Sequence, residues 1–440
     1  MKRRTFIKNT ALTTAGLGLT APYIRSWAGP ASDEVSVAIM GCNGRGDFLA
    51  GAFTHVKGVK VKYICDVDTR ALEKGINTVN KEAGYKPKGF GDIRKMLEQK
   101  DFDALVVATP DHWHTPAAIM GCEAGKHVYV EKPCCHNPGE GEWLVKAARK
   151  YNKHVQMGDQ RRSHPLYLKA IKELHDGMIG RVYFARAWYA NNRGPIGNGK
   201  QTAVPDWLNY ELWQGPAPRR PYQDNLIHYN WHWFWHWGTS ETCNNGTHEI
   251  DVMRWGLQEE FPVKVTSSGG RYRYNDDWQT PDTQVLAFDF NDKKSMMWEG
   301  RSCNGLNEED DGRGVIFYGE NGSMKLLNTR YLVYDADSKL IKEEKEKSDQ
   351  PTDVVNTVGP GLQFDIHHLA NFIETIRGNQ KLNSEIAVGY TSTVYPLLGN
   401  IAYRTQHELT IDPSNGHFLS DPEAVKYWDR EYEPGWTPKV

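Results

Sequence analysis

The sequence predicts an α/β protein that begins with strands and helices wound into a parallel sheet. A short run rich in β-branched residues, Val35–Met40, precedes a glycine-rich turn at 41–46 and a segment with helical spacing at 47–53. A second such run, Val59–Cys65, follows directly. Since strand, helix and strand alternate, the unit is βαβ, and its strands should be parallel neighbours. The length of 440 residues, 39% of them hydrophobic, fits a globular chain of two domains.

Composition and charge exclude several classes of protein. The chain has 53 Lys and Arg against 55 Asp and Glu, without a basic stripe, so we expect no nucleic acid partner. No later segment reaches the ~18 apolar residues of a membrane span. Fifteen Trp and 21 Tyr are many for this length, and such rings often line sites for ligands with apolar faces, such as sugars.

The first 28 residues read as a targeting segment. A basic start at 2–4 and a weakly apolar stretch at 11–24 precede small residues, which places cleavage after Ala28. The run from Arg3 to Lys8 resembles a twin-arginine export signal, a pathway that carries folded proteins. We therefore expect a periplasmic or otherwise exported protein. A disordered or helical N-terminal tail is the alternative.

The cysteines predict neither a disulfide framework nor a metal site. Their number is odd, their spacing is wide, and no C-x-x-C pair occurs. We expect buried thiols, as in a protein that folds in the reducing cytoplasm. The seven are Cys42, Cys65, Cys122, Cys134, Cys135, Cys243 and Cys303.

The turn after the first strand predicts a dinucleotide site. It departs from G-x-G-x-x-G because Asn43 holds the middle glycine position, beside an additional Gly44. Asp66 ends the second strand 25 residues after Gly41, near the ~20-residue offset at which an acidic side chain meets the adenosine ribose. A glycine turn lets the backbone approach a pyrophosphate at the start of the next helix.

The acidic residue favours NAD, because its carboxylate accepts from a ribose 2′-OH and would repel a 2′-phosphate. Arg45 and Arg70 are near enough in sequence to Asp66 to weaken that exclusion, so NADP stays open. Ordinary surface charge is the other interpretation of these two arginines.

Two further strands complete the N-terminal pattern. Residues 104–108 form a strand that opens into Thr109-Pro110, a helix is expected at 117–124, and His127–Val130 is a strand that ends in Glu131-Lys132-Pro133. Ligands bind at the carboxyl ends of strands in such sheets. The residues that follow each strand are therefore site candidates.

The runs ATPDHWH at 108–114 and AGKHVYVEKP at 124–133 resemble the Gfo/Idh/MocA oxidoreductases, a family of NAD(P)-dependent sugar and polyol dehydrogenases. Further matches lie at 158–162, 246–251, 254–255 and 369–378, and those at 389–404 and 412–413 resemble the exported, sugar-acting branch. Residues 191–229 match least.

The resemblance implies two domains. These are a Rossmann domain at 33–155 and a substrate-binding α/β domain at 156–440, built on an open, mostly antiparallel sheet. We expect helix 389–404 to pack back on the Rossmann domain, and copies of the chain to associate through the sheet of the second domain.

By resemblance Lys132 is the catalytic lysine, and His248 is the second candidate. Burial lowers the pKa of a lysine, which lets it take the proton of a secondary alcohol. In the family an Asp lies four residues before this histidine, but here the position is Asn244, and an amide cannot exchange a proton at neutral pH. Proton transfer should then rest on Lys132 and His248, with Asn244 orienting substrate. Asp251 would fix the His248 tautomer or bind substrate.

Two sets of binding residues follow. We expect the cofactor to meet Gly41, Asn43, Gly44, Arg45, Gly46, Asp66, Thr109, Pro110, Trp113, His114, Glu131 and Lys132. We expect the substrate to meet Gln160, Arg161, Trp233, Trp235, Asn244 and Asp251.

The run 228–237 alternates Trp with other residues. On a strand, four Trp would share one face while His228, His232 and His236 share the other. Three such histidines suggest zinc, but a stacking floor for a sugar ring or inter-domain packing is the preferred interpretation, and no metal is expected. Polar segments at 308–314, 334–339 and 342–352 are expected to be loops.

Three functions remain open. The first is an exported NAD(P)-dependent oxidoreductase that acts on a ring hydroxyl of a sugar or glycoside and holds its cofactor tightly. The second is a glycosidase of the same fold, in which NAD⁺ transiently oxidises a ring carbon and the net redox change is zero. The third is a non-catalytic sugar-binding protein, against which the presence of Lys132 and His248 argues.

Overall fold

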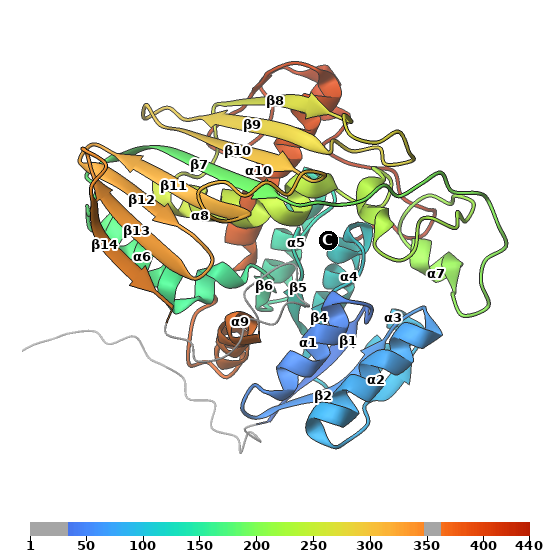
Figure 1. Ribbon diagram of the computed structural model, residues 1–440. Helices are drawn as coiled ribbons and strands as arrows, with labels where there is room; N and C mark the ends of the chain where they lie inside the picture. The colour runs from blue at the N-terminus through green and yellow to red at the C-terminus, as the bar shows by residue number, and fades with distance from the viewer. Residues whose placement is uncertain (1–33, 347–361) are drawn as a thin grey trace, which may run out of the picture. The chain divides into compact units, whose positions relative to one another are not determined.

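Two sheets organise the part of the chain that the structure, a computed structural model, describes: residues 34–346 and 362–440. Residues Val35–Val440 belong to one unit, in which the blue and teal N-terminal elements of Figure 1 carry the first sheet. The expected signal segment at 1–28 lies outside the described residues. The fold class is therefore α/β with a parallel and a mixed sheet, as the sequence predicts.

The first sheet is parallel and has six strands in the order β3-β2-β1-β4-β5-β6. Strand order reverses direction at β1 and β4, the position at which doubly wound sheets bind ligands. Its strands are β1 (Val35–Met40), β2 (Val59–Cys65), β3 (Lys88–Phe90), β4 (Ala104–Val107), β5 (His127–Val130) and β6 (Val155–Met157). Strands β1, β2 and β5 have the predicted bounds, and β4 ends one residue before its predicted end.

Helices connect these strands. They are α1 (Arg45–Thr54), α2 (Thr69–Ala83), α3 (Ile93–Leu97), α4 (Asp111–Glu123) and α5 (Pro138–Lys150). The predicted start of α4 at residue 117 is wrong, because the helix begins six residues earlier and runs through Pro116. Pro110 stands at the N-cap of α4, whereas Pro116 lies in the helix interior, where its missing N–H removes one i→i−4 hydrogen bond.

The second sheet has nine strands in the order β14-β13-β12-β11-β7-β10-β9-β8-β15. Only β7 and β10 pair in parallel; the other neighbours are antiparallel, so the predicted open, mostly antiparallel sheet is confirmed. The strands are β7 (Val182–Ala190), β8 (Lys264–Gly270), β9 (Thr283–Asp289), β10 (Ser295–Arg301), β11 (Arg313–Gly319), β12 (Gly322–Leu326), β13 (Arg330–Asp335), β14 (Leu340–Lys345) and β15 (Leu409–Thr410).

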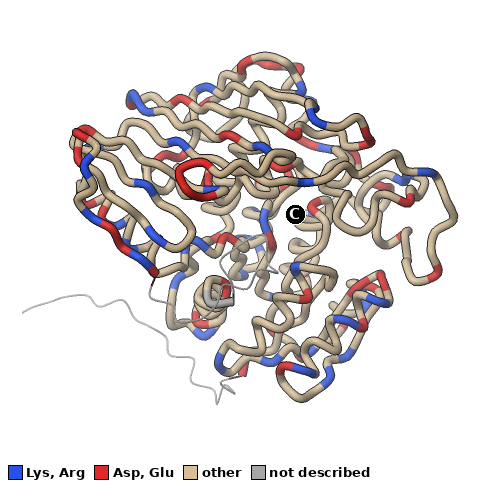
Figure 2. Tube along the Cα trace, in the orientation of Figure 1, with Lys and Arg blue, Asp and Glu red and all other residues tan. Residues whose placement is uncertain are grey.

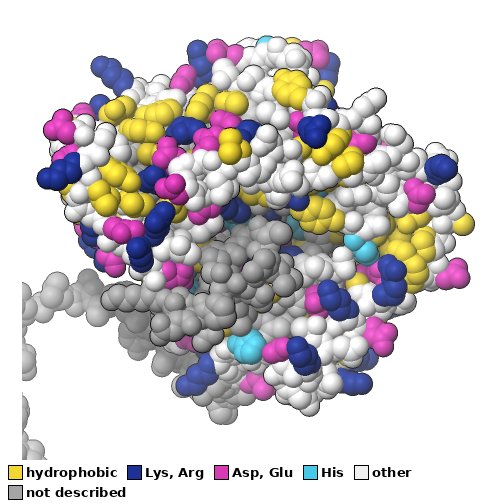
Figure 3. All heavy atoms as spheres, viewed as in Figure 1, with side chains coloured by type: hydrophobic (Ala, Val, Ile, Leu, Met, Phe, Trp, Pro, Cys, Tyr) yellow, Lys and Arg dark blue, Asp and Glu magenta, His cyan; other side chains and the backbone are white. Residues whose placement is uncertain are grey.

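One face of this sheet carries helices α6 (Pro165–His175), α8 (Thr247–Leu257) and α10 (Ile386–Thr405). Alternation along β7 separates the faces: Ala187 joins the main core, whereas Trp188 packs in a small cluster with Ile316 and Leu332. Figure 3 shows several hydrophobic side chains over this sheet.

Segments late in the sequence return to the first sheet. Helix α10 contacts α5 and β6, and α9 (Leu362–Ile376) contacts α1. Phe372 of α9 packs edge-on against Tyr129 of β5, with ring centroids 5.9 Å apart. The C-terminal helices thus help to form the core beneath the first sheet.

Residues 191–238 form a long excursion with its own small hydrophobic cluster, drawn in green at the right of Figure 1 with α7 (Tyr210–Gln214). The strand geometry considered for 228–237 does not occur. A 3₁₀ helix, Asn230–Trp233, and turns occupy this segment, because the aromatic rings pack in different directions. Trp233 stacks on Trp278 at 4.0 Å, and Trp237 packs against Trp213 at 4.9 Å.

Two of the three predicted loops are mostly loop or turn in the structure, and the third is partly a strand. Residues 308–314 are a loop until β11 begins at Arg313, and 334–339 hold the turn between β13 and β14. The prediction at 342–352 is wrong for 342–345, which belong to β14, an edge strand with charged residues on both faces; residues 347–352 lie outside the described residues.

Charges of both signs are interspersed along the described trace (Figure 2). All seven cysteines are buried free thiols, as predicted. None of the described helices combines the length and apolar content needed to cross a membrane.

Candidate functional site

The glycine turn between β1 and α1 needs its glycines. Gly41 has φ +85°, and a Cβ there would lie 2.7 Å from the Ala108 carbonyl oxygen. A Cβ on Gly46 would lie 1.6 Å from the Gly41 carbonyl oxygen, while Gly44, with φ +64°, faces open space. The backbone can therefore approach a ligand at the start of α1, where unpaired N–H groups favour a phosphate.

A cavity opens beside this turn, at the carboxyl ends of β1, β2 and β4. The structure brings together six of the predicted cofactor residues in its wall: Gly41, Asn43, Asp66, Thr109, Pro110 and Trp113. The buried Thr109 hydroxyl has no hydrogen-bond partner among the described residues, so it is free to meet a ligand. The turn, the carboxylate and this hydroxyl fit a dinucleotide.

Asp66 is placed to bind the ribose. Its Oδ2 accepts from the Cys42 N–H at 2.5 Å and its Oδ1 from the Asp68 N–H at 2.8 Å. Burial raises the pKa of Asp66, while these two N–H groups oppose that rise. Each oxygen retains a lone pair that can accept from a ribose hydroxyl.

The two arginines that could have neutralised a 2′-phosphate are engaged elsewhere. Arg45 pairs with Glu131 at 2.7 Å and with Asp365 at 2.5 Å. Arg70 pairs with Asp68 at 2.9 Å and lies 3.4 Å from the centre of the Trp207 ring. Asp66 therefore keeps its negative charge unbalanced by either arginine, which agrees with NAD.

Three other predicted cofactor residues lie beside the cavity but face the protein. His114 bridges the Pro133 and Thr109 carbonyl oxygens at 2.6 and 2.8 Å, which ties the end of β5 to that of β4. Glu131 and Arg45 form the pair just described. These side chains position the strand ends rather than line the described cavity.

Lys132 lies two residues after the end of β5 and is 9% exposed. Its Nζ donates to the Asn244 carbonyl oxygen at 2.5 Å and to the Asn244 Oδ1 at 3.1 Å. Burial lowers the pKa of Lys132, and the carboxylates of Glu131 and Asp111 partly offset this. The arrangement holds a lysine that can be neutral nearer to physiological pH than a free one.

His248 lies on α8, in the second part of the chain. Its Nδ1 meets Asp159 Oδ1 at 3.2 Å, and its Nε2 has no partner among the described residues. Burial and the nearby Lys132 ammonium lower the pKa of His248 well below its usual range, so the ring is neutral. The expectation that Asp251 fixes its tautomer is wrong, because Asp251 instead accepts from Arg162 and from Ser392.

The predicted substrate residues do not converge. Gln160 donates to Asp365 at 3.4 Å, and Arg161 pairs with Glu249 at 2.7 Å inside the core. Trp233 is 1% exposed, and Trp235 lines a different cavity. A hydrogen bond accounts for Gln160, an ion pair for Arg161 and stacking on Trp278 for Trp233, without a ligand. Asn244, which contacts Lys132, is the one of the six that the structure places at the candidate catalytic lysine.

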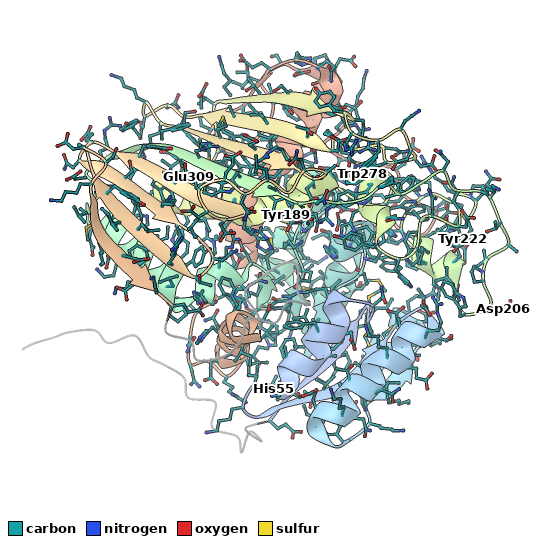
Figure 4. The ribbon with its side chains drawn as sticks, viewed as in Figure 1. His55, Tyr189, Asp206, Tyr222, Trp278 and Glu309 are labelled. Atoms are coloured by element: carbon teal, nitrogen blue, oxygen red, sulfur yellow. The ribbon has the colours of Figure 1, made fainter. Side chains whose placement is uncertain are left out.

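Sequence reasoning missed a network around Asn244. Glu241 Oε1 accepts from the Asn244 side chain at 3.2 Å and pairs through Oε2 with Arg193 at 2.6 Å. Arg193 in turn donates to the Tyr229 hydroxyl at 2.6 Å. Figure 4 labels Tyr189, whose hydroxyl also accepts from Arg193 at 3.3 Å. Glu241 could have been noticed three residues before Asn244, whereas Arg193 lies in the least matched part of the chain.

The zinc alternative finds no support in the geometry. His228, His232 and His236 bond separately to Asp68, to the Tyr229 carbonyl and to the Pro218 carbonyl. No cluster of three potential ligands that could hold a metal ion occurs among the described residues.

Family models match both parts of the chain. Residues 35–159 match an oxidoreductase family's NAD-binding Rossmann fold, and residues 187–437 match that family's C-terminal α/β domain. The chain belongs to the Gfo/Idh/MocA oxidoreductase family. It is thus an NAD-binding oxidoreductase.

Curated relatives match over a shorter stretch. A glycosyl hydrolase family 109 protein of Saccharopolyspora erythraea is 28% identical over 251 residues, which are 50% of this chain and 55% of the relative. One of Shewanella pealeana is 28% identical over 210 residues, 43% of this chain and 46% of the relative. The chain spans about half the length of these relatives.

Solved structures show the same fold. A levoglucosan dehydrogenase in complex with NADH and levoglucosan has a TM-score of 0.67 at 17% identity and covers 86% of this chain and 99% of its own. The WlbA dehydrogenase of Bordetella pertussis, in complex with NADH and UDP-GlcNAcA, has a TM-score of 0.63 at 18% identity and covers 86% and 99%.

Proposed function

We propose that this oxidoreductase uses NAD to oxidise a ring hydroxyl of a sugar or glycoside, or to reduce the corresponding ring ketone, with Lys132 as the base in the oxidation. The observation that carries the proposal is the buried Lys132 amine, which two Asn244 oxygens hold at the end of β5. The sugar ligands of the levoglucosan and WlbA dehydrogenases, which share the fold, support this substrate class.

The side chains divide the work as follows. When neutral, the Lys132 amine accepts the proton of the substrate hydroxyl, and Asn244 fixes the direction of its lone pair. With Nδ1–H donating to Asp159, His248 presents its Nε2 lone pair to a substrate hydroxyl. The Glu241–Arg193 pair anchors Asn244. Bound NAD supplies the hydride acceptor.

A redox-neutral glycosidase is the second candidate, because the curated relatives are glycosyl hydrolase family 109 proteins. The two candidates differ in what they release. Purified protein is incubated with aryl glycosides while phenol release and absorbance of reduced cofactor are followed together. Oxidised sugar with stoichiometric cofactor reduction supports the oxidoreductase, and phenol release without added cofactor supports the glycosidase. Absence of both phenol release and cofactor reduction would support a non-catalytic sugar-binding protein.

We also propose that the cofactor is held tightly. Leu212, Trp213, His228 and Trp231 of the excursion 191–238 line the cavity opposite the glycine turn, so the ligand would be enclosed by two layers of protein. The test purifies the protein without added cofactor, denatures it and quantifies dinucleotide in the supernatant. We expect about one equivalent per chain; far less, with activity that needs millimolar NAD, would contradict the idea.

Export by the twin-arginine pathway remains a proposal that rests on Arg3 and Arg4. A pathway for folded proteins would allow a captive cofactor to travel with the enzyme. The double variant Arg3→Lys, Arg4→Lys should stay in the cytoplasm with its activity intact, and its normal export would contradict the assignment.

Association of copies through the nine-stranded sheet is likewise proposed. Phe184 of β7 and Tyr318 of β11 stack at 5.6 Å and are partly exposed, so they offer an apolar surface. Light scattering should show more than one chain per particle, and charged substitutions at these two positions should reduce it to one.

A further inference from the structure

A second cavity lies where α5 begins, between the end of α10, the last residues of the chain and the excursion 191–238. Asn137, Arg404 and Arg430 are among its lining residues, together with the Trp235 and Tyr427 rings. It shares no lining residue with the dinucleotide cavity. A ligand in it would therefore be distinct from the cofactor.

Buried polar atoms without partners lie in the wall of this cavity. Asn137 is 6% exposed, and its Oδ1 caps α5 by accepting from the Glu140 N–H at 3.1 Å. Asn137 Nδ2, Arg430 Nη1 and His136 Nε2 are buried and have no hydrogen-bond partner among the described residues. Asn137 Nδ2 and Arg430 Nη1 are donors, and an unpaired buried donor costs about 1–3 kcal/mol, so these two in one wall indicate that an acceptor binds there.

Glu140 holds these groups in place. Its side chain is fully buried and accepts from Arg430 Nε at 2.8 Å, from the Tyr432 hydroxyl at 2.6 Å and from the His136 N–H at 3.0 Å. The free edge of Arg430 and the Asn137 amide are consequently oriented before any ligand arrives. Such pre-organisation lowers the entropic cost of binding.

Two exposed arginines complete the cavity. Arg404 lies between two rings, 4.0 Å from the centre of Tyr427 and 5.0 Å from that of Trp235. Neither Arg404 nor Arg220 forms an ion pair with a carboxylate of the described residues. The other two arginines of the cavity are neutralised, Arg430 by Glu140 and Arg219 by Glu211, each at 2.6 Å. The unpaired guanidiniums and the N-terminal end of the 13-residue helix α5 favour negative charge.

Two acidic residues also line the cavity and restrict where an anion can lie. They are Asp429 and Glu431, both exposed. Asp429 leans over Gly139, where a Cβ would lie 2.0 Å from its Oδ1, and Glu431 follows Arg430 in the C-terminal segment. An anion would thus be directed toward Arg404 and the Asn137 amide.

We propose that this cavity binds an oxyanion, that is, a carboxylate, sulfate or phosphate group carried by a small molecule. The Asn137 amide and the free edge of Arg430 donate to its oxygens, and Arg404 supplies the opposite charge. Trp235 and Tyr427 also line the cavity, so both an inorganic ion and an acidic sugar satisfy the same chemistry.

The test is calorimetric titration of the full protein saturated with NAD, so that the dinucleotide site is occupied. The probes are inorganic sulfate, inorganic phosphate, glucuronate and, as the uncharged comparison, glucose. We expect one oxyanion per chain with a dissociation constant that the Arg404→Gln variant weakens at least tenfold. Binding of glucuronate alone would identify a sugar acid as the occupant, and binding of all three anions would identify the oxyanion itself.

Two variants keep the test sharp. Asn137→Asp retains the oxygen that caps α5, so it should fold normally, yet it replaces the amide donor by a carboxylate and should abolish binding. Arg273→Gln is the matched control, because Arg273 is an exposed arginine 4.8 Å from the Tyr274 ring, outside this cavity. No oxyanion binding to the unmodified protein, equal binding of glucose, or equal losses in all three variants would overturn the proposal.

Discussion

The six-stranded sheet and the excursion 191–238 line the same cavity, but different interactions position their residues there. The sheet places Gly41, Asp66 and Thr109 by strand order, since the carboxyl ends of parallel neighbours lie at one edge. The excursion places Trp213 and His228 by contacts between side chains far apart in sequence. Chemistry can thus rest on a regular scaffold while enclosure of the ligand depends on an irregular segment.

Three of the contacts that join the two regions lie close to Asp66. The His228 Nε2 meets Asp68 Oδ2 at 2.7 Å, the Thr69 N–H donates to the Trp207 carbonyl at 2.9 Å, and Arg70 lies on the Trp207 ring. All three reach the start of α2, directly after Asp66. The excursion is therefore fastened beside the residue that should bind the ribose.

The largest effect should come from the scaffold. Lys132→Ala removes the proposed base, so turnover should fall by roughly 10²-fold or more, as general base catalysis typically supplies 10²–10⁴-fold. Steady-state rates and cofactor content measure this, and cofactor should still bind. Lys126→Met, which removes another buried lysine with a lowered pKa that lines none of the described cavities, is the matched control. Turnover within about twofold of normal in Lys132→Ala would remove the catalytic assignment.

Loss of the ribose carboxylate comes next. Asp66→Ala should weaken NAD binding roughly tenfold to a hundredfold, because a hydrogen bond to a charged group contributes about 1.5–3 kcal/mol. Discrimination against NADP should relax as well, since the repulsion of a 2′-phosphate is lost. Fluorescence titration with both dinucleotides measures the two constants. A preference for NADP in the unmodified protein would contradict the assignment.

A variant in the excursion distinguishes retention of bound NAD from the choice between NAD and NADP. His228→Ala breaks the bond to Asp68 but leaves Asp66 in place, so release of NAD should quicken by roughly tenfold at most. Unlike Asp66→Ala, it should not change the choice between NAD and NADP. Stopped-flow displacement gives the release rate. An unchanged rate would show that the excursion does not retain the cofactor.

The pH dependence tests the electrostatics of the lysine. Burial lowers the pKa of Lys132, and only the neutral amine accepts a proton, so oxidation should rise as pH rises through that lowered pKa and then level off. Asp111 raises the pKa of Lys132, so Asp111→Asn should move the rise in rate to lower pH. The rate of oxidation by the unmodified protein and by Asp111→Asn is measured between pH 6 and 10 to test this shift. Burial lowers the pKa of His248 well below its usual range, so His248 stays neutral over this pH interval. If the rise in rate moved with His248→Asn and not with Asp111→Asn, the assignment to Lys132 would be contradicted.

The same comparison explains what could be predicted from the sequence. The bounds of β1 and β5 follow from runs of mostly buried apolar residues, because both faces of a parallel sheet are covered, and β2 has such a run at its carboxyl end. The alternation at 228–237 has the period of a strand, yet no neighbouring strand pairs with it, so ring stacking prevails. A local pattern cannot reveal such a partner.

The residues of the candidate site also fall into those that a local pattern predicts and those that tertiary contacts position. Lys132 and Asp66 stand directly after predicted strands, and their position needs no further information. The partner of His248 is Asp159, 89 residues earlier, and the sequence pointed instead to Asp251 on the same helix. Arg161 and Gln160 resembled binding residues, but long-range carboxylates engage them. Pairings across the chain depend on tertiary packing, which spacing does not encode.

The smallest effect should come from the outer contact between the two regions. Trp207→Leu keeps an apolar side chain but loses the stacking on Arg70, whose side chain is 56% exposed, so the interaction is worth about 0.5 kcal/mol. The melting temperature should move by about 1 °C or less. Local opening should increase, however, because the Trp207 carbonyl helps to hold the Thr69 N–H. Hydrogen exchange at Thr69 and Asn209 should therefore quicken several-fold while exchange in β4 and β5 stays unchanged. Equal acceleration in both places would mean that the excursion and the sheet unfold as one unit.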